Sequence, residues 1–193
     1  EIANGKLEYV GGFFDLLTPF TLVAGVYGCL FIAFHGAVYL SVKSSGAVET
    51  NSLAIGKKLG IIALVACIIF IGTAYLSLEN TSVLSGLFLA GSGILLAVAY
   101  FLFRNGKIKL TLLLNFVVIA FTMTALFTGL FPNAMVSSLG SANNLTLVDA
   151  SSSAYTLKVM SVIALTLLPF ILAYQYWTFR VFKARMKLED VKY

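Results

Sequence analysis

The sequence predicts an all-α protein, a polytopic transmembrane helix bundle with five membrane helices. The chain has 193 residues, of which 60% are hydrophobic and only 11% are charged, whereas soluble domains carry about 25% charged residues. Its mean hydropathy is +0.97, and apolar runs recur along almost the whole chain. No run of alternating apolar and polar residues resembles a membrane strand, so helices are the structure that can satisfy the backbone in lipid.

Five apolar runs are long enough to cross a hydrocarbon core, which needs about 20 helical residues. They span residues 16–42, 59–78, 81–103, 110–131 and 159–179. Residues 1–193 are therefore expected to form a single membrane domain, with no room for a soluble one. Cys29 and Cys67 each lie inside a run, where a thiol behaves as a small hydrophobic group, so neither a disulfide nor a metal site is expected.

Two prolines bear on the first and fifth helices. Pro19 falls in the first turn of residues 16–42, where its missing N–H does little harm, and Asp15 is expected to cap that turn. Pro169 lies inside residues 159–179. It is expected to kink or interrupt this helix unless neighbouring groups bind the carbonyl oxygen that it frees.

Small and polar residues within the runs indicate where helices approach one another. Gly86 and Gly93 of the third run, and Gly25 of the first, belong to patterns of small residues four apart, which allow close helix contacts in membranes. The fourth run carries four side chains that are able to hydrogen-bond to a neighbouring helix: Asn115, Thr122, Thr124 and Thr128. These patterns favour packing over ligand binding.

The basic residues lie in short clusters between the runs and determine the predicted topology, because Lys and Arg accumulate in cytoplasmic loops. Eleven flank the first connector, occupy the third or follow the fifth helix: Lys43, Lys57, Lys58, Arg104, Lys107, Lys109, Arg180, Lys183, Arg185, Lys187 and Lys192. The N-terminus is therefore expected outside and the C-terminus in the cytoplasm. The net charge of +5 forms no basic face, so nucleic-acid binding is not expected.

An odd number of helices with an outside N-terminus is unusual for a complete protein. The chain starts at Glu1 without an initiator Met, and its first residues show no export signal. We therefore expect further transmembrane helices upstream, and interpret residues 1–193 as the C-terminal part of a longer subunit.

His35 is the single histidine and lies late in the first run. Ionisable groups inside a membrane are costly and often functional, so one interpretation is a haem ligand or proton relay. The other is a neutral imidazole hydrogen-bonded to a neighbouring helix, because one His cannot form a bis-His site and no Met or Cys beside it offers a second ligand. No nucleotide-binding loop, metal-ligand spacing or nucleophile motif is present. No catalytic and no metal-ligating residue is predicted.

The connector Leu130–Leu157 reads LFPNAMVSSLGSANNLTLVDASSSAYTL and is polar without being basic. Phe131 and Pro132 are expected to end the fourth helix, and residues 149–153 to lead into the fifth through Asp and Ser capping. An acid in a Ser-rich loop is expected to accept several hydrogen bonds, which would make Asp149 a structural residue. The connector is therefore predicted to be an ordered cap on the outer face.

Five segments, in order, resemble a known family. They are GGFFDLLTPFTLVAG at residues 11–25, HGAVYL at 35–40, FPNAMVSS at 131–138, LTLVDASSSAYTLKVM at 145–160 and LPFILAYQYWTFRVF at 168–182. Together they closely resemble the second half of subunit II of the cytochrome bd quinol oxidases of bacteria and archaea. The family motifs supply the expected structural or interface residues: Phe131, Pro132, Ser137, Ser138, Asp149, Ala150, Ser151, Ser152, Ser153, Thr156 and Leu157.

The resemblance implies a complex in a bacterial or archaeal cell membrane that oxidises quinol, reduces dioxygen to water and contributes to a proton gradient. It implies that two haems b and one haem d are ligated by a partner subunit I and none by this chain, which would support the assembly and stability of that partner. Other implied partners are the N-terminal helices of the same subunit, a small single-helix subunit, and a bound quinone or lipid.

A different class of function also stays open, namely half of a small-molecule membrane transporter. Transporters often contain interrupted helices and close helix contacts. The expected interruption of residues 159–179 at Pro169, together with the small-residue patterns, motivates this alternative.

Overall fold

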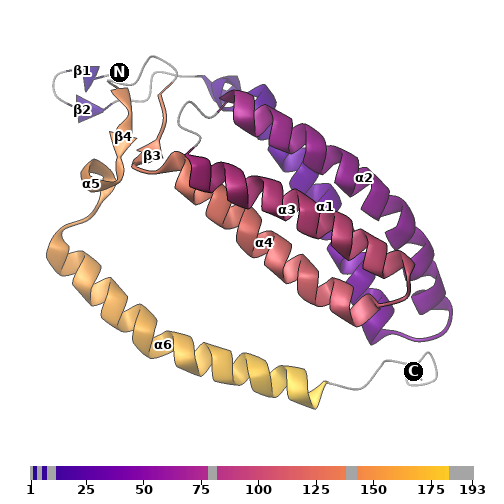
Figure 1. The fold of residues 1–193 in the computed structure, drawn as a ribbon. Helices are drawn as coiled ribbons and strands as arrows, with labels where there is room; N and C mark the ends of the chain where they lie inside the picture. The colour runs from indigo at the N-terminus through magenta and orange to yellow at the C-terminus, as the bar shows by residue number, and fades with distance from the viewer. Residues whose placement is uncertain (1, 4–5, 8–11, 78–81, 138–142, 183–193) are drawn as a thin grey trace.

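The computed structural model describes residues 2–3, 6–7, 12–77, 82–137 and 143–182. Within that part of the chain, five helices are long and apolar enough to cross a membrane, which confirms the predicted all-α transmembrane fold. They are α1 (Pro19–Lys43), α2 (Ala47–Ser77), α3 (Val83–Arg104), α4 (Ile108–Leu130) and α6 (Ala154–Val181) (Figure 1). The shorter elements are β1 (Ile2–Ala3), β2 (Lys6–Leu7), the 3-10 helix η1 (Phe13–Leu16), β3 (Asn133–Met135), β4 (Leu145–Thr146) and α5 (Leu147–Ala150).

Helix α1 begins where Thr18 caps its first turn. The Thr18 Oγ1 atom accepts a hydrogen bond from the backbone N–H of Thr21 at 3.2 Å. Pro19 stands at the start of the helix, where its missing N–H costs no helical hydrogen bond, as the sequence predicts. The expectation that Asp15 caps this helix is wrong, because Asp15 belongs to the separate turn η1.

Helix α2 begins at Ala47, well before the predicted start at Leu59. Its first turns carry charged residues, so hydropathy alone excludes them from the apolar run. Small residues on one side of this segment, Ser52 and Gly56, are nevertheless buried against the rest of the bundle. Tertiary packing therefore extends the helix beyond its apolar part.

Short turns fold α1 to α4 into a four-helix body. Gly46, between α1 and α2, and Gly106, between α3 and α4, have φ angles of 73° and 75°. Residues other than glycine rarely adopt such positive φ angles. The largest fully buried side chains in the interior include Phe34, Phe70, Phe103, Leu89, Leu96, Val38 and Val118. The rings of Phe34 and Phe103 meet edge to face with their centroids 5.6 Å apart. The four-helix body is therefore held together mainly by the packing of large apolar side chains.

Helices α2 and α3 approach closely because glycines of each lie under aromatic rings of the other. A Cβ atom at Gly60 would lie 2.7 Å from Tyr100 Cε2, and one at Gly86 would lie 2.6 Å from the Tyr75 hydroxyl oxygen. The close contact predicted for Gly86 is therefore confirmed. At Gly25 no close contact is present among the described residues, because nothing lies within 4 Å of a Cβ atom placed there.

Helix α6 lies apart from the four-helix body (Figure 1). None of its residues is buried. The helix is continuous through Pro169, so the expected interruption is not present. Membrane helices tolerate an interior proline when local adjustments satisfy the carbonyl group that it frees.

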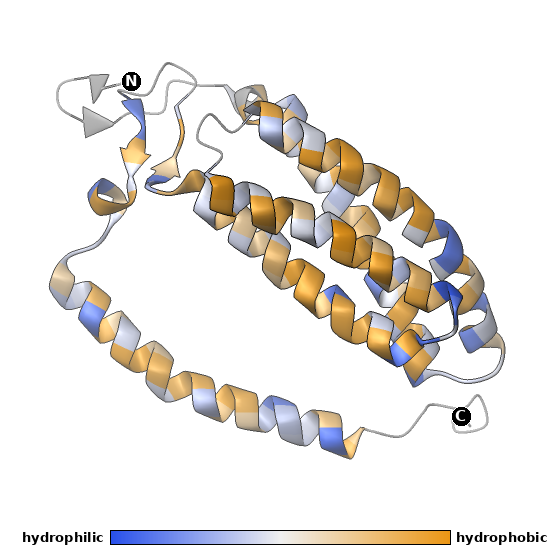
Figure 2. Ribbon diagram, in the orientation of Figure 1, coloured by the Kyte–Doolittle hydropathy of each residue, from blue (hydrophilic) through white to orange (hydrophobic). Residues whose placement is uncertain are grey.

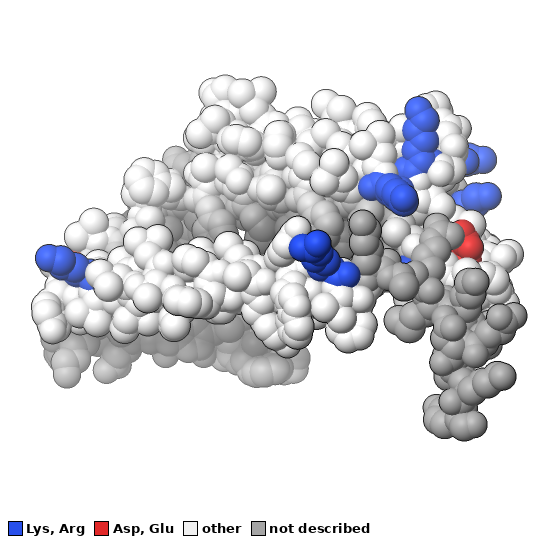
Figure 3. Space-filling view, turned by 90° about the horizontal axis from the view of Figure 1, so that it is seen from below, with Lys and Arg blue, Asp and Glu red and all other residues white. Residues whose placement is uncertain are grey.

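Charged and apolar residues are segregated along the four-helix body. Figure 2 shows the helices to be apolar along most of their length, and Figure 3 shows a group of Lys and Arg side chains at one end of the molecule, with others elsewhere along it. That end carries the turn from α1 to α2 and the turn from α3 to α4. The connector from α4 to α6 lies at the opposite end (Figure 1).

Candidate functional site

The connector after α4 begins with a short two-stranded ribbon. Helix α4 ends at Leu130, with Phe131 as its C-cap, and the peptide bond between Phe131 and Pro132 is cis. Strand β3 then pairs with β4 in antiparallel register. The fourth helix therefore ends where Phe131 and Pro132 predict.

Two hydrogen bonds close this ribbon beyond the strand pairing. The carbonyl oxygen of Pro132 accepts a hydrogen bond from the backbone N–H of Leu147 at 3.0 Å. The side-chain oxygen of Asn144 accepts one from the backbone N–H of Ser137 at 2.8 Å. These bonds join the segment before residues 138–142 to the segment after them. Ser138, a predicted site residue, lies outside the described residues.

Thr146 and Asp149 form a local capping pair at α5. The Thr146 hydroxyl oxygen accepts a hydrogen bond from the backbone N–H of Asp149 at 3.2 Å and donates one to Asp149 Oδ2 at 2.6 Å. The expectation of several hydrogen bonds to Asp149 is therefore wrong, since the described residues supply its carboxylate with one. Asp149 also caps no transmembrane helix, because it lies within α5. The sequence interpretation missed Thr146, although Thr-x-x-Asp is a recognisable capping pattern.

Ser153 is the N-cap of α6, which confirms the expected serine capping of the last helix. Its hydroxyl oxygen accepts a hydrogen bond from the backbone N–H of Thr156 at 3.4 Å and lies 2.9 Å from the Thr156 hydroxyl. Ser151 donates to the carbonyl oxygen of Val148 at 2.8 Å and so closes the end of α5. The remaining motif residues, Ala150, Ser152 and Leu157, are exposed.

His35 packs between aromatic rings rather than in a polar site. Its ring lies 6.4 Å from the ring of Phe31 on its own helix and 5.2 Å from that of Phe116 on α4, centroid to centroid. Its Nδ1 atom is buried and has no hydrogen-bond partner. The hydrogen bond that the sequence predicts between His35 and a neighbouring helix is therefore not formed by Nδ1. His35 instead contacts α4 through the aromatic ring of Phe116.

Asn115 is the most unusual polar residue in the interior. It is 0% exposed, and neither its side-chain nitrogen nor its oxygen has a hydrogen-bond partner in the structure.

Thr124 and Thr128, which the sequence suggested as interhelical donors, instead donate hydrogen bonds to carbonyl oxygens of their own helix. Thr122 also donates to its own helix, at the carbonyl oxygen of Val118.

Hydrogen bonds between α3 and α4 come from two residues that the sequence interpretation did not select. Ser85 of α3 donates to the carbonyl oxygen of Ala125 on α4 at 2.9 Å, and Thr111 of α4 lies 3.3 Å from the carbonyl oxygen of Ala99 on α3. Both side chains are almost completely buried. Their small size and their spacing on the inner helix faces were the signals that could have identified them.

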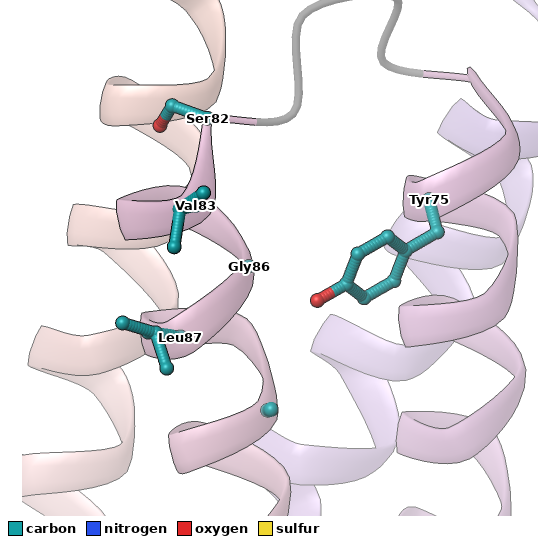
Figure 4. A pocket seen from close by; sticks show the side chains of 6 residues that line it. Tyr75, Ser82, Val83, Gly86 and Leu87 are labelled. Carbon is teal, nitrogen blue, oxygen red and sulfur yellow. The ribbon is translucent and has the colours of Figure 1, made fainter.

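A hollow of about 390 Å³ opens between the ends of α2 and α3, with the Tyr75 ring directed across it toward Gly86 (Figure 4). Its lining is Tyr75, Ser82, Val83, Gly86, Leu87 and Ala90, none of which is charged. Across residues 2–3, 6–7, 12–77, 82–137 and 143–182, no three His, Cys, Asp or Glu side chains are grouped so that they could hold a metal ion.

Comparison with known proteins decides the family. A family model described as cytochrome bd terminal oxidase subunit II matches residues 1–182. The chain belongs to this family. It is 32% identical over 182 residues to the cytochrome bd ubiquinol oxidase subunit 2 of Bacillus subtilis, covering 91% of this chain and 53% of the relative. It is 27% identical over 222 residues to the cytochrome bd-I ubiquinol oxidase subunit 2 of Escherichia coli, covering 97% and 58%. The chain spans about half the length of these curated relatives.

Membership of the cytochrome bd subunit II family, together with its five apolar helices, makes this a multi-pass bacterial membrane protein. The family also implies haem in the complex. His35, the single histidine of this chain, lies between two aromatic rings, and its Nδ1 atom is enclosed. Neither cysteine is placed with it in a group that could hold a metal ion.

Proposed function

We propose that this chain acts within subunit II of a bd-type terminal oxidase that oxidises membrane quinol and reduces dioxygen to water. In this proposal two haems b and one haem d are ligated by subunit I, where the redox chemistry takes place. This chain is not catalytic by itself and supports the assembly and stability of subunit I. The observation that carries the proposal is the family match over residues 1–182.

The internal construction of the chain supports a structural role. The interior of the four-helix body is filled by large side chains such as Phe34, Phe70 and Phe103. Interhelical hydrogen bonds are made by Ser85, Tyr100 and Thr111. A rigid apolar body of this kind can hold a neighbouring subunit in place by shape complementarity, without a reactive group of its own.

The proposed orientation places the N-terminus outside and the C-terminus in the cytoplasm. The basic end of the four-helix body then faces the cytoplasm, in agreement with the accumulation of Lys and Arg on that side of membranes. The connector of residues 131–153 then caps the outer face, held by the ribbon and by the Thr146 and Ser153 caps. We assign to its motif residues, from Phe131 to Leu157, the positioning of α6 and of the surface that meets subunit I.

Helix α6 has the most surface available for such a contact. None of its residues is buried against α1 to α4. The alternative of a transporter half loses one of the two observations that motivated it, because α6 is continuous through Pro169; the small-residue contact at Gly86 remains.

The test is to purify the complex from membranes through an affinity tag on this chain and to record a reduced-minus-oxidised absorbance spectrum. Haem d and haem b signals are expected in the preparation, together with quinol-dependent oxygen consumption. A stable preparation of this chain without haem d would overturn the proposal. Substrate uptake by vesicles that contain this chain without a haem partner would favour the transporter alternative.

A further inference from the structure

A second hollow, between the start of α2 and the end of α3, combines three cations with an apolar floor. It has a volume of about 190 Å³ and is lined by Lys57, Lys58, Ile61, Tyr100 and Arg104. None of the lining residues is acidic, and the structure records no salt bridge from these three cations to the residues it describes. Three cationic residues therefore line one small volume, and no acidic side chain among the described residues shares that lining.

The walls of this hollow are fixed by packing. The Tyr100 ring lies against Gly60, where an added Cβ atom would be 2.7 Å from Tyr100 Cε2. The Tyr100 hydroxyl donates a hydrogen bond to the backbone carbonyl oxygen of Lys57 at 3.3 Å. One turn earlier, Gly56 lies against the buried ring of Phe103. These contacts keep Lys57 and Lys58 level with Arg104, so the convergence of charge does not depend on mobile loops.

The level of the hollow along the helices matches that of lipid headgroups. Lys57 and Lys58 immediately precede the apolar part of α2, and Arg104 is the last residue of α3. Ile61 and Tyr100 lie about one turn further into the apolar region. A ligand that bound here would have its charged group among the cations and its apolar part along Ile61 and Tyr100.

We propose that this hollow binds the headgroup of an anionic phospholipid. Its phosphodiester group accepts hydrogen bonds from the Arg104 guanidinium, which can donate two in parallel, and from the Lys57 and Lys58 ammonium groups. Basic pockets between membrane helices have the charge and depth to hold such headgroups. A zwitterionic lipid is disfavoured, because its own ammonium group meets three cations. This proposal does not depend on the redox activity of the complex.

The proposal is tested on the assembled complex in nanodiscs that contain either phosphatidylglycerol and phosphatidylcholine or phosphatidylcholine alone, with retained lipids counted by native mass spectrometry. The variant is Lys57→Gln, Lys58→Gln, Arg104→Gln, and the matched control is Lys107→Gln, Lys109→Gln, which removes charge from the same end of the bundle outside the hollow. We expect the triple variant to lose roughly a hundredfold in affinity for phosphatidylglycerol, about fivefold for each cation. The control is expected to keep it.

Three outcomes would overturn the proposal. The first is equal retention of phosphatidylglycerol by the triple variant and the wild type. The second is retention of phosphatidylcholine as strongly as phosphatidylglycerol by the wild type, which also decides the question if the triple variant fails to assemble. The third is displacement of the lipid by inorganic phosphate at equal concentration, which would show that the hollow recognises a free anion and not a lipid. Cardiolipin in place of phosphatidylglycerol then shows whether one phosphate or two are preferred.

Discussion

The Lys43 side chain donates a hydrogen bond from Nζ to the backbone carbonyl oxygen of Phe182 at 2.7 Å. Lys43 is the last residue of α1, and Phe182 is the C-cap of α6. Within the described part of the chain, this is the hydrogen bond that joins α6 to the four-helix body. The carbonyl groups at a helix C-terminus carry partial negative charge, so an ammonium group there is favourable.

Replacing Lys43 with Met is expected to free the C-terminal end of α6 while leaving α1 to α4 folded. The expected loss of stability is about 1 kcal/mol, because one hydrogen bond near the surface is removed. Spin labels at Leu40 and Phe179 of the assembled complex would report this as a broader distance distribution. Lys109→Met, which removes a charge from the same end without a contact to α6, is the control. An unchanged distribution in Lys43→Met would show that other contacts position α6.

Replacing Thr146 with Ala is expected to loosen the connector. The variant loses both the N-cap of α5 and the hydrogen bond to Asp149, and the loss of an N-cap costs about 0.5–2 kcal/mol. Faster proteolysis between residues 147 and 153 of the assembled complex would reveal the effect. Thr146→Ser keeps the hydroxyl group and is expected to behave as the wild type. Equal proteolysis of both variants would mean that the hydroxyl does not order the connector.

The transmembrane fold was predictable because the bilayer imposes a simple requirement on sequence. Each helix needs about 20 apolar residues, and this requirement leaves the same signature whatever the helix packs against. The start of α2 was missed because its first turns are polar and become helical through the burial of Ser52 and Gly56. Asp15 and Thr18 are three positions apart and both are residue types that cap helices, so the sequence does not decide between them. The backbone decides, because Asp15 lies in η1 and Thr18 directly precedes α1.

The contacts of the candidate site were less predictable, since they depend on the register between helices. The contact of Gly60 with Tyr100, and that of His35 with Phe116, join residues far apart in sequence. Neither the hydropathy pattern nor short sequence motifs determine how one helix is aligned along another. Thr146 is the exception, because its capping partner Asp149 lies three positions away and could have been found by pattern.

His35→Gln is expected to leave the haem content of the complex unchanged. In the proposed division of labour the haems are ligated by subunit I, and the His35 ring packs against Phe31 and Phe116. Pyridine haemochrome analysis of the purified complex measures the haem stoichiometry. Loss of one haem from an otherwise assembled complex would make His35 a ligand or a direct support of one.

Asn115→Leu is expected to keep or raise the thermal stability of the complex. The Asn115 amide is completely buried and its two polar atoms lack partners, a situation that costs about 1–3 kcal/mol. Leucine has the same branching at Cγ and removes the polar atoms. Asn115→Ala, which removes the same atoms but leaves a cavity, is expected to lower the midpoint of thermal unfolding. A fall in the midpoint for Asn115→Leu as large as that for Asn115→Ala would show that the amide stabilises the fold.

Gly60→Ala and Gly72→Ala test whether α2 and α3 are held at their observed separation by glycine. Both residues lie inside α2, so both substitutions have the same small intrinsic benefit for a helix. At Gly72 nothing lies within 4 Å of an added Cβ atom, whereas at Gly60 the atom would overlap the Tyr100 ring and lie 3.0 Å from Phe34 Cε2. Phe34 is fully buried, and the Tyr100 hydroxyl is bonded to Lys57, so neither ring can move away without loss.

Gly60→Ala is therefore expected to destabilise the complex by about 1–3 kcal/mol, the usual range for overpacking, while Gly72→Ala is neutral or slightly stabilising. Thermal unfolding of the two purified variants under the same detergent conditions measures the difference. Combining Gly60→Ala with Tyr100→Leu should recover part of the loss, because leucine is smaller than the ring that the methyl group meets. Equal midpoints for Gly60→Ala and Gly72→Ala would show that α2 and α3 can separate without cost, and that the close approach is not what holds this pair of helices together.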